Sequence, residues 1–321
     1  MSELRNQFVS LPYPSVDCTG RTIAVVGANI GLGKEAVRHF VRLNASKVIM
    51  AVRSIEKGED AKIDIEETTK RTGVLEVWKL DLTSYASVLS FAARLENEPR
   101  VDAVVANASI ATQKFEMAED NESTITVNVI STLLLVLLVL PIMRASAERW
   151  NIHPAITVVS SGIHSWIKFP EWEAPNCLEA LNNPKAANMN DRYAASKLLQ
   201  VFAVDEIASK MGGKSKVVLN IISPGLVKTA LGRNATGFTK FSLALMKFLM
   251  ARTPEMGSRT LVHAATAGPE SHGKYFTDCD ITLDSRSDFV KSADGLKAQQ
   301  KIWDEIAKKL EAIQPGVTGN I

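Results

Sequence analysis

The stretch TIAVVGANIGLG, residues 22–33, decides the fold. It opens with the apolar, β-branched run Thr22–Val26, which is typical of a strand buried on both faces. Glycines at positions 27, 31 and 33 follow, and the segment from about Gly31 to Asn44 predicts a helix. Glycines let a backbone approach a pyrophosphate closely, and a helix N-terminus offers it free N–H groups. The stretch therefore predicts a dinucleotide-binding strand, turn and helix, although its G-x-x-x-G-x-G spacing differs from the more common G-x-G-x-x-G.

The same rhythm of apolar strand and amphipathic helix continues along the chain. Alternating strands and helices indicate an α/β fold of the doubly wound, Rossmann type, in which a parallel sheet binds ligands at the carboxyl ends of its strands. The further predicted strands are Lys47–Val52, Leu75–Lys79, Val101–Ala106, Ala155–Ser160 and Lys216–Ile222. We expect a single catalytic domain over 21–313, an N-terminal arm over 1–20 and a C-terminal tail over 314–321.

Two long insertions interrupt this rhythm and are predicted to form a substrate lid. Residues 162–192 are polar and aromatic, and residues 226–252 end in the apolar sequence FSLALMKFLMAR. Long irregular excursions in a compact domain usually serve as lids or binding loops. Surface loops without a function are the alternative, since loops tolerate insertion. The run Phe241–Met250 suits a lid on a greasy substrate, contact with a membrane surface, or core packing.

Composition narrows the possible partners. With 46% hydrophobic residues, 22% charged residues and a net charge of +2, the chain of 321 residues reads as a soluble globular protein without the basic face that nucleic acid requires. Cys18, Cys177 and Cys279 have neither disulfide nor metal-ligand spacing, which favours a reducing, cytoplasmic setting and no metal site. The apolar run Val129–Met143 is shorter than the ~20 residues of a transmembrane helix, so we expect a buried helix and no membrane span.

The end of the second predicted strand bears on the choice of dinucleotide. NAD-specific sites place an acidic residue there to bind the ribose 2′-hydroxyl. This chain has Arg53 instead, and no acidic residue before Glu56. A guanidinium pairs well with a 2′-phosphate. The sequence therefore predicts NADP(H) as the cofactor. The alternative is that Arg53 is simply a solvated arginine at a strand end.

A tyrosine and a lysine four residues apart form the candidate catalytic pair. Tyr193 and Lys197 lie in a predicted helix, where this spacing puts them on one face. A nearby ammonium stabilises a phenolate and lowers the pKa of the tyrosine. Such a tyrosine can give a proton to a carbonyl oxygen or take one from an alcohol. Taken alone, the pair fits an exposed helix face equally well.

Several further motifs occur in a fixed order around this pair. They are Gly27 to Gly33, Ala106-Asn107-Ala108-Ser109, Asn128, Ser161, Tyr193-x-x-x-Lys197 and Pro224-Gly225. In order and spacing, over about residues 18–312, the set resembles the short-chain dehydrogenase/reductase family. The long gap between Ser161 and Tyr193 is most similar to the retinol-dehydrogenase-like and fungal secondary-metabolism branches. Three positions depart from the family pattern: Val26 stands in place of a threonine, and in the Asn-Asn-Ala-Gly motif Ala106 and Ser109 replace the first asparagine and the glycine.

The resemblance implies a role for each matching residue. Tyr193 would be the general acid/base, Lys197 would lower its pKa and hold the ribose hydroxyls, and Ser161, rather than Ser160, would bind the substrate oxygen. Asn128 would anchor a water in the proton relay. The implied cofactor contacts are Gly27, Asn29, Gly31, Leu32 and Gly33 at the pyrophosphate, Asp81 and Leu82 at the adenine, Asn107 and Ala108 at the adenosine-side ribose, and Pro224, Val227 and Thr229 at the nicotinamide.

The expected function is NADPH-dependent interconversion of a carbonyl and an alcohol on a hydrophobic small molecule. The family resemblance also implies that the helix of Val129–Met143 could form the interface of a homodimer. A cofactor-bound isomerase, dehydratase or cyclase is one alternative, and a non-catalytic NADP(H)-binding regulator is another. His164 is a further candidate for substrate contact, or a plain loop residue. The residues expected to make the pocket hydrophobic are Trp166, Phe169, Trp172, Phe241, Met246 and Phe248.

Overall fold

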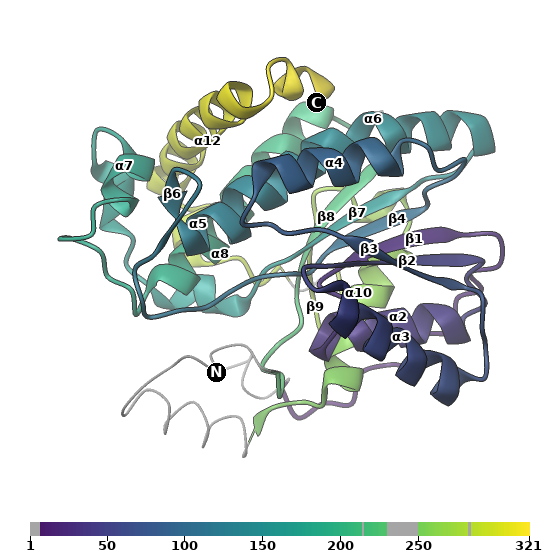
Figure 1. The fold of residues 1–321 in the computed structure, drawn as a ribbon. Helices are drawn as coiled ribbons and strands as arrows, with labels where there is room; N and C mark the ends of the chain where they lie inside the picture. Colours follow the sequence, from purple (N-terminus) through teal and green to yellow (C-terminus); the bar gives the residue numbers. More distant parts are fainter. Residues whose placement is uncertain (1–6, 214, 230–249, 282–283) are drawn as a thin grey trace.

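A seven-stranded parallel sheet forms the centre of the molecule (Figure 1). The computed structural model describes residues 7–213, 215–229, 250–281 and 284–321. The strand order is β3-β2-β1-β4-β7-β8-β9. The strands are β1 (Thr22–Val26), β2 (Lys47–Val52), β3 (Leu75–Lys79), β4 (Ala103–Ala106), β7 (Ala155–Val159), β8 (Val218–Ser223) and β9 (Tyr275–Thr277), and β5 (Met117–Ala118) pairs with β6 (Asn121–Glu122) in a separate hairpin. The predicted doubly wound α/β fold is confirmed.

Helices cover both faces of the sheet (Figure 1). One layer holds α2 (Gly31–Arg42), α3 (Ile55–Thr69) and α10 (Pro254–Ala265), and the other holds α4 (Tyr85–Leu95), α6 (Thr132–Trp150), α8 (Arg192–Met211) and α12 (Ala293–Ile313). The shorter helices are α5 (Ser123–Ile125), α7 (Cys177–Leu181) and α11 (Asp288–Lys291), with a π-helical turn at Thr126–Ser131 and 3-10 turns at Gly162–Trp166, Pro170–Glu173, Pro269–Ser271 and Val317–Asn320.

Each layer buries its own hydrophobic core against the sheet. Phe40 from α2, Ile65 from α3 and Leu261 from α10 belong to one core. The other core is larger and includes Phe202 from α8 and Trp303 from α12. Because successive side chains of a strand point to opposite faces, every central strand supplies both cores and reads as a continuous apolar run.

Helix α6 is the apolar helix expected from the run Val129–Met143. Within the described residues, the helical stretch Ser123–Trp150 is long and apolar enough to cross a membrane by length and composition, but 83% of its most apolar window is buried inside the protein. A core helix passes the same test, and the burial agrees with that interpretation.

Candidate active site

The predicted site residues gather at the carboxyl edge of the sheet. Gly27 follows β1, Asn107 follows β4, Ser161 follows β7 with one residue between, and Pro224 follows β8. The register places Val26 opposite both Ala51 of β2 and Ala106 of β4, so these strand ends lie level with one another. Strands β1 and β4 flank the point where the strand order reverses, which is where doubly wound folds bind ligands.

Lys197 is held inside the protein by two acceptors. It is 0% exposed, and its Nζ donates to the main-chain oxygen of Val159 at 2.8 Å and to Gln200 Oε1 at 3.0 Å. The same nitrogen lies 5.5 Å from the centre of the Tyr193 ring, so helix α8 brings the two residues together as predicted. Burial lowers the pKa of Lys197 to about 7, because a charged ammonium is poorly solvated there.

The hydroxyl of Tyr193 interacts with two serines. Burial raises the pKa of Tyr193 above its usual value, and hydrogen bonds with Ser109 and Ser161 oppose that increase. The expected lowering of this pKa by Lys197 is therefore not produced by the protein's own groups, since the partial burial of the phenol has the larger effect. Ser109, which stands where the family has glycine, adds a hydroxyl that contacts Tyr193.

Ser161 and Ser160 have different surroundings. Ser161 is the residue that reaches Tyr193, while Ser160 Oγ donates to the main-chain oxygen of Lys197 at 3.2 Å. His164 supports the loop: its Nδ1 lies 2.8 Å from the oxygen of Ser161, and its Nε2 accepts from the backbone nitrogen of Ser287 at 3.2 Å. These partners fix a neutral ring with the proton on Nδ1, and burial also lowers the pKa of His164. His164 therefore holds the main chain of Ser161 in place through this hydrogen bond.

Asn128 connects the loop after β4 to helix α8. Its Oδ1 accepts from the backbone nitrogen of Ile110 and its Nδ2 donates to the oxygen of Ile110, both at 2.9 Å. The Nδ2 atom also donates to Ser196 Oγ at 2.9 Å. Asn128 sits in the π-helical turn Thr126–Ser131, a widened geometry that is frequent at functional sites. Its main-chain oxygen accepts from Gln200 Nε2 at 2.6 Å.

The glycine turn after β1 is closed by Asn107. Gly27 has a φ of +76°, and Asn107 Nδ2 donates to the oxygens of Val26 and Gly27 at 2.9 and 3.3 Å. A Cβ on Gly33 would collide with the oxygen of Gly27 and lie 2.7 Å from Asn107 Nδ2, so only glycine fits there. Asn107 thus acts in this structure as a brace of the turn.

The turn fits the pyrophosphate of a dinucleotide. Helix α2 begins at Gly31 after Ile30, which has no polar side chain to cap it, and its first turn carries no acidic residue. Its first N–H groups are therefore available to an anion, and the helix dipole favours negative charge at this end. Thr229 approaches the same turn, since a Cβ on Gly31 would lie 3.6 Å from Thr229 Cγ2.

Two cations stand at the ends of β2 and β3. Arg53 is exposed directly after β2, and Lys79 Nζ donates to the Arg53 main-chain oxygen at 2.6 Å. Both side chains are exposed beside the glycine turn, whose Gly27 nitrogen donates to the oxygen of Ala51 at 2.8 Å. Sequence analysis singled out Arg53 and missed Lys79, because a lysine that ends a strand has no distinguishing motif.

The remaining implied cofactor residues line the same edge. Asp81 Oδ1 accepts from the nitrogen and the hydroxyl of Thr83 at 3.0 and 2.8 Å, which shapes the turn after β3. Val227 bridges to Arg252, and together with Leu32 it packs on Gly257 of α10, where a Cβ would lie 2.6 Å from Val227. Leu82 is buried, and Asn29, Ala108 and Thr229 are partly exposed.

The first predicted lid segment, 162–192, is attached to helix α12. Phe169 is buried in the larger core, the tilted rings of Trp172 and Phe289 lie with their centres 6.1 Å apart, and Trp166 is exposed. Glu305 caps α7 by accepting from the nitrogens of Cys177 and Leu178 at 3.0 Å each. Of the second segment, 226–252, residues 230–249 lie outside the described residues, and so do Phe241, Met246 and Phe248.

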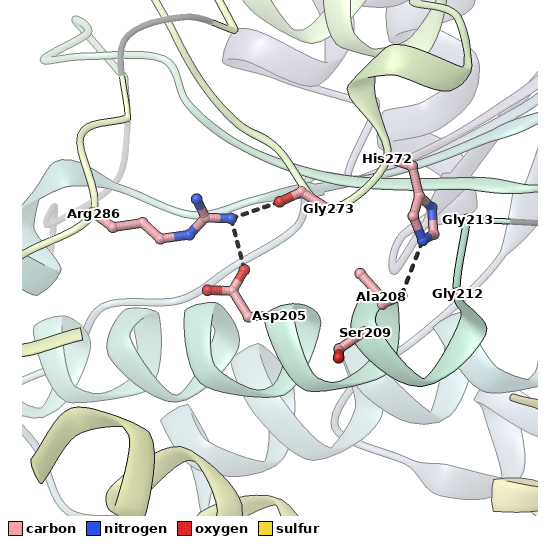
Figure 2. Close-up of a pocket in the computed structure, with 8 residues that line it drawn as sticks. All are labelled: Asp205, Ala208, Ser209, Gly212, Gly213, His272, Gly273 and Arg286. Carbon is pink, nitrogen blue, oxygen red and sulfur yellow. Dashed lines mark hydrogen bonds and ion pairs between the residues drawn. The ribbon is translucent and has the colours of Figure 1, made fainter. Parts of the chain in front are cut away.

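A surface cavity of about 360 Å³ lies far from this site, at the other end of α8 (Figure 2). Its polar groups pair with one another: Arg286 Nη2 contacts Asp205 at 2.8 Å and the oxygen of Gly273 at 2.7 Å, and His272 Nε2 lies 3.0 Å from the oxygen of Ala208. At 1.5 Å of rise per residue, Asp205 is roughly 18 Å along the helix from Tyr193. The cavity takes no part in the candidate site. Among the described residues, no group of three or more His, Cys, Asp or Glu side chains is arranged to hold a metal.

Comparison with known proteins assigns the family. Residues 21–163 match the family model for short chain dehydrogenase. The chain is 49% identical over 320 residues to the short chain dehydrogenase/reductase dmxR8 of Cryptosporiopsis sp. (strain 8999), which covers 98% of this chain and 97% of that protein. The chain is a short-chain dehydrogenase/reductase. Another fungal member, the short-chain dehydrogenase anuD of Penicillium roqueforti, is 42% identical over 97% of this chain and 82% of its own length.

Solved structures of this family share the fold. The putative short chain dehydrogenase of Escherichia coli CFT073, complexed with NADPH, has a TM-score of 0.60 and 24% identity, and the alignment covers 83% of this chain and 99% of that chain. The Escherichia coli oxidoreductase yciK has a TM-score of 0.61 and 25% identity over 83% of this chain and 98% of that chain. The resemblance to the short-chain dehydrogenase/reductase family drawn from the motifs is confirmed, and this family is one of oxidoreductases.

Proposed function

We propose that this short-chain dehydrogenase/reductase uses NADP(H) to interconvert a carbonyl and an alcohol on a hydrophobic small molecule in the cytoplasm. The observation that carries the proposal is the contact of the Tyr193 hydroxyl with Ser161 beside the buried amine of Lys197. The exposed cations Arg53 and Lys79 near the glycine turn favour the 2′-phosphate of NADP(H). The relative from Escherichia coli CFT073 that carries NADPH supports the same cofactor.

The chain's own residues supply the proton chemistry. Bound at the glycine turn, the reduced cofactor would supply the hydride. Tyr193 and Ser161 would hold the substrate oxygen between their hydroxyls, and Tyr193 would donate its proton to that oxygen during reduction. Lys197, when charged, would stabilise the phenolate that remains. Reduction is the proposed direction, and the fungal relatives favour a secondary-metabolite intermediate as the substrate.

Loss of NADPH absorbance against a panel of hydrophobic ketones and aldehydes tests this proposal. We expect Tyr193→Phe to lower kcat by about 10²–10⁴-fold, because it removes the acid/base group, while NADPH binding measured by fluorescence stays within a few-fold. Tyr13→Phe, at an exposed tyrosine, is the matched control and should retain full activity. Full activity of Tyr193→Phe would refute the proposal. Product formation without loss of NADPH would favour an isomerase or cyclase, and intact cellular function of Tyr193→Phe would favour a regulator.

A further inference from the structure

Gln200 lies three residues after Lys197 on helix α8 and joins two parts of the candidate site. Its Oε1 accepts from Lys197 Nζ at 3.0 Å, and its Nε2 donates to the main-chain oxygen of Asn128 at 2.6 Å. Gln200 is 1% exposed, and both residues that it joins are 0% exposed. The side-chain amide is therefore a closed bridge between α8 and the π-helical turn.

We propose that Gln200 is a positioning residue for the catalytic pair: its side-chain amide, anchored on the Asn128 main-chain oxygen, fixes the Lys197 amine. The proposal rests on the proposed function, because it concerns the same acid–base site.

The bridge has only one chemically consistent orientation. An ammonium has three donors and no acceptor, so the glutamine oxygen must face Lys197 and the NH₂ group must face the carbonyl. Val159 takes a second ammonium proton at 2.8 Å, which leaves one N–H of Lys197 for a ligand in the site. An amide neither gains nor loses a proton near neutral pH, whereas water does both. The bridge therefore holds the lysine without relaying protons.

Few other groups control the charge of this amine. Tyr193 is the titratable side chain in contact with it, at 5.5 Å from ring centre to Nζ. The π-helical turn and β8, which pack against α8, carry no charged side chain. His164, on the neighbouring 3-10 turn, is bonded to Ser161 and Ser287, and α12 contacts α8 through Gln299 and Glu206, further along the helix. Of the two oxygens that accept from Lys197, only the amide oxygen of Gln200 belongs to a side chain, so it is the one that a substitution can change.

Two substitutions with opposite expected effects test the role. Gln200→Glu places a carboxylate beside Lys197, which favours the charged amine. Gln200→Met keeps the length of the side chain and removes the acceptor, which favours the neutral amine. The direct readout is carbon NMR of the lysine ε-carbon, assigned with Lys197→Met, because it needs no substrate. Gln299→Met is the matched control, since Gln299 of α12 is a partly exposed glutamine that donates to Glu206 of α8 at 2.9 Å, away from Lys197.

We expect Lys197 of the wild-type protein to titrate near its lowered pKa of about 7. Gln200→Glu should move this pKa up and Gln200→Met should move it down, each by about one pH unit, and Gln299→Met should leave it unchanged. The basic limb of the kcat/KM profile with NADPH should move with the NMR value, because Lys197 acts in its charged form. Shifts of equal sign in both Gln200 variants, or none in either, would overturn the proposal. Opposite NMR shifts in a protein that reduces no carbonyl would retain the bridge and reject the proposed function.

Discussion

Lys197, the proposed partner of Tyr193, holds its amine at a place where a positive charge is unfavourable. Burial lowers its pKa from 10.5 to about 7. Between these two pH values the unfolded chain binds a proton that the folded protein does not, so the free energy of unfolding rises with pH over this window. The destabilising effect is fully present below about pH 7 and is gone above about pH 10.5.

Lys197→Met should therefore stabilise the protein at low pH. We expect its free energy of unfolding to exceed that of the wild type by roughly 2–4 kcal/mol near pH 6, an estimate that allows for the unpaired oxygens of Val159 and Gln200, and the two proteins to converge as the pH approaches 10. Urea denaturation across this range measures the difference. A difference independent of pH would show that packing, and not charge, is responsible.

Arg53 is the residue expected to select the dinucleotide. Arg53→Ala should raise the KM for NADPH by about tenfold or more and leave the KM for NADH nearly unchanged, because only NADPH has the 2′-phosphate. Lys79→Ala should act in the same direction. Arg149→Ala, at an exposed arginine beside Trp150, is the control. Equal changes with both cofactors would contradict the assignment.

At the scale of single elements, the start of helix α8 determines where Tyr193 stands. Arg192, immediately before Tyr193, is 2% exposed and lies 3.7 Å from Glu122, whose carboxylate is 0% exposed, measured from Nε to Oε2. Glu122 Oε1 also accepts from the nitrogen of Thr124 at 2.9 Å. The pair therefore joins α8 to the segment that leads into the π-helical turn.

Glu122→Gln should be strongly destabilising, because it keeps the acceptor for Thr124 and leaves the charge of Arg192 buried without a counter-ion. We expect a loss of about 3–5 kcal/mol in the free energy of unfolding. Glu122→Gln combined with Arg192→Met should recover much of that loss. A loss below about 1 kcal/mol in the single variant would mean that water reaches Arg192.

Element prediction succeeded where one apolar run has clear ends. The bounds of β1, β2 and β3 agree with the sequence prediction. Strands β4 and β8 begin two residues later than predicted, because the residues just before them do not mark where the strand starts. Strand β9 was missed, since three residues show no periodicity. The Tyr193–Lys197 pair followed from helical spacing. The contact from Gln200 to the Asn128 oxygen did not, because it joins residues 72 positions apart through a main-chain atom.

At the scale of the whole molecule, the C-terminal segment packs against helices α8 and α6 of one layer (Figure 1). Helix α12 packs on α8, with Ile302, Trp303 and Ile306 in the larger core. Arg144 of α6 donates to the oxygens of Asn320 and Ile321 at 2.6 Å each, and Asn320 Nδ2 donates to the oxygen of Leu137 at 3.2 Å. Residues 314–321, predicted as a tail, thus contact α6.

This covering bears on the homodimer that the sequence left open. Because most of α6 is buried within one chain, we expect no dimer through the helix of Val129–Met143, and Arg144→Ala should leave the mass measured by light scattering at micromolar concentration unchanged. A stable dimer that Arg144→Ala dissociates would contradict this expectation.

Trp303→Ala should lower the free energy of unfolding by about 3–5 kcal/mol through loss of core packing.

The π-helical turn at Thr126–Ser131 constrains the length of the chain before α6. A π turn accommodates one residue more than an α turn, so deletion of a single residue here would let regular α geometry run through to Trp150. The preceding segment would then rotate by about 100° around the helix axis, which would carry the Asn128 side chain away from Ile110 and Ser196. During evolution this segment can therefore accept substitutions, but loss of even one residue would break the hydrogen bonds through which Asn128 connects the loop after β4 to α8.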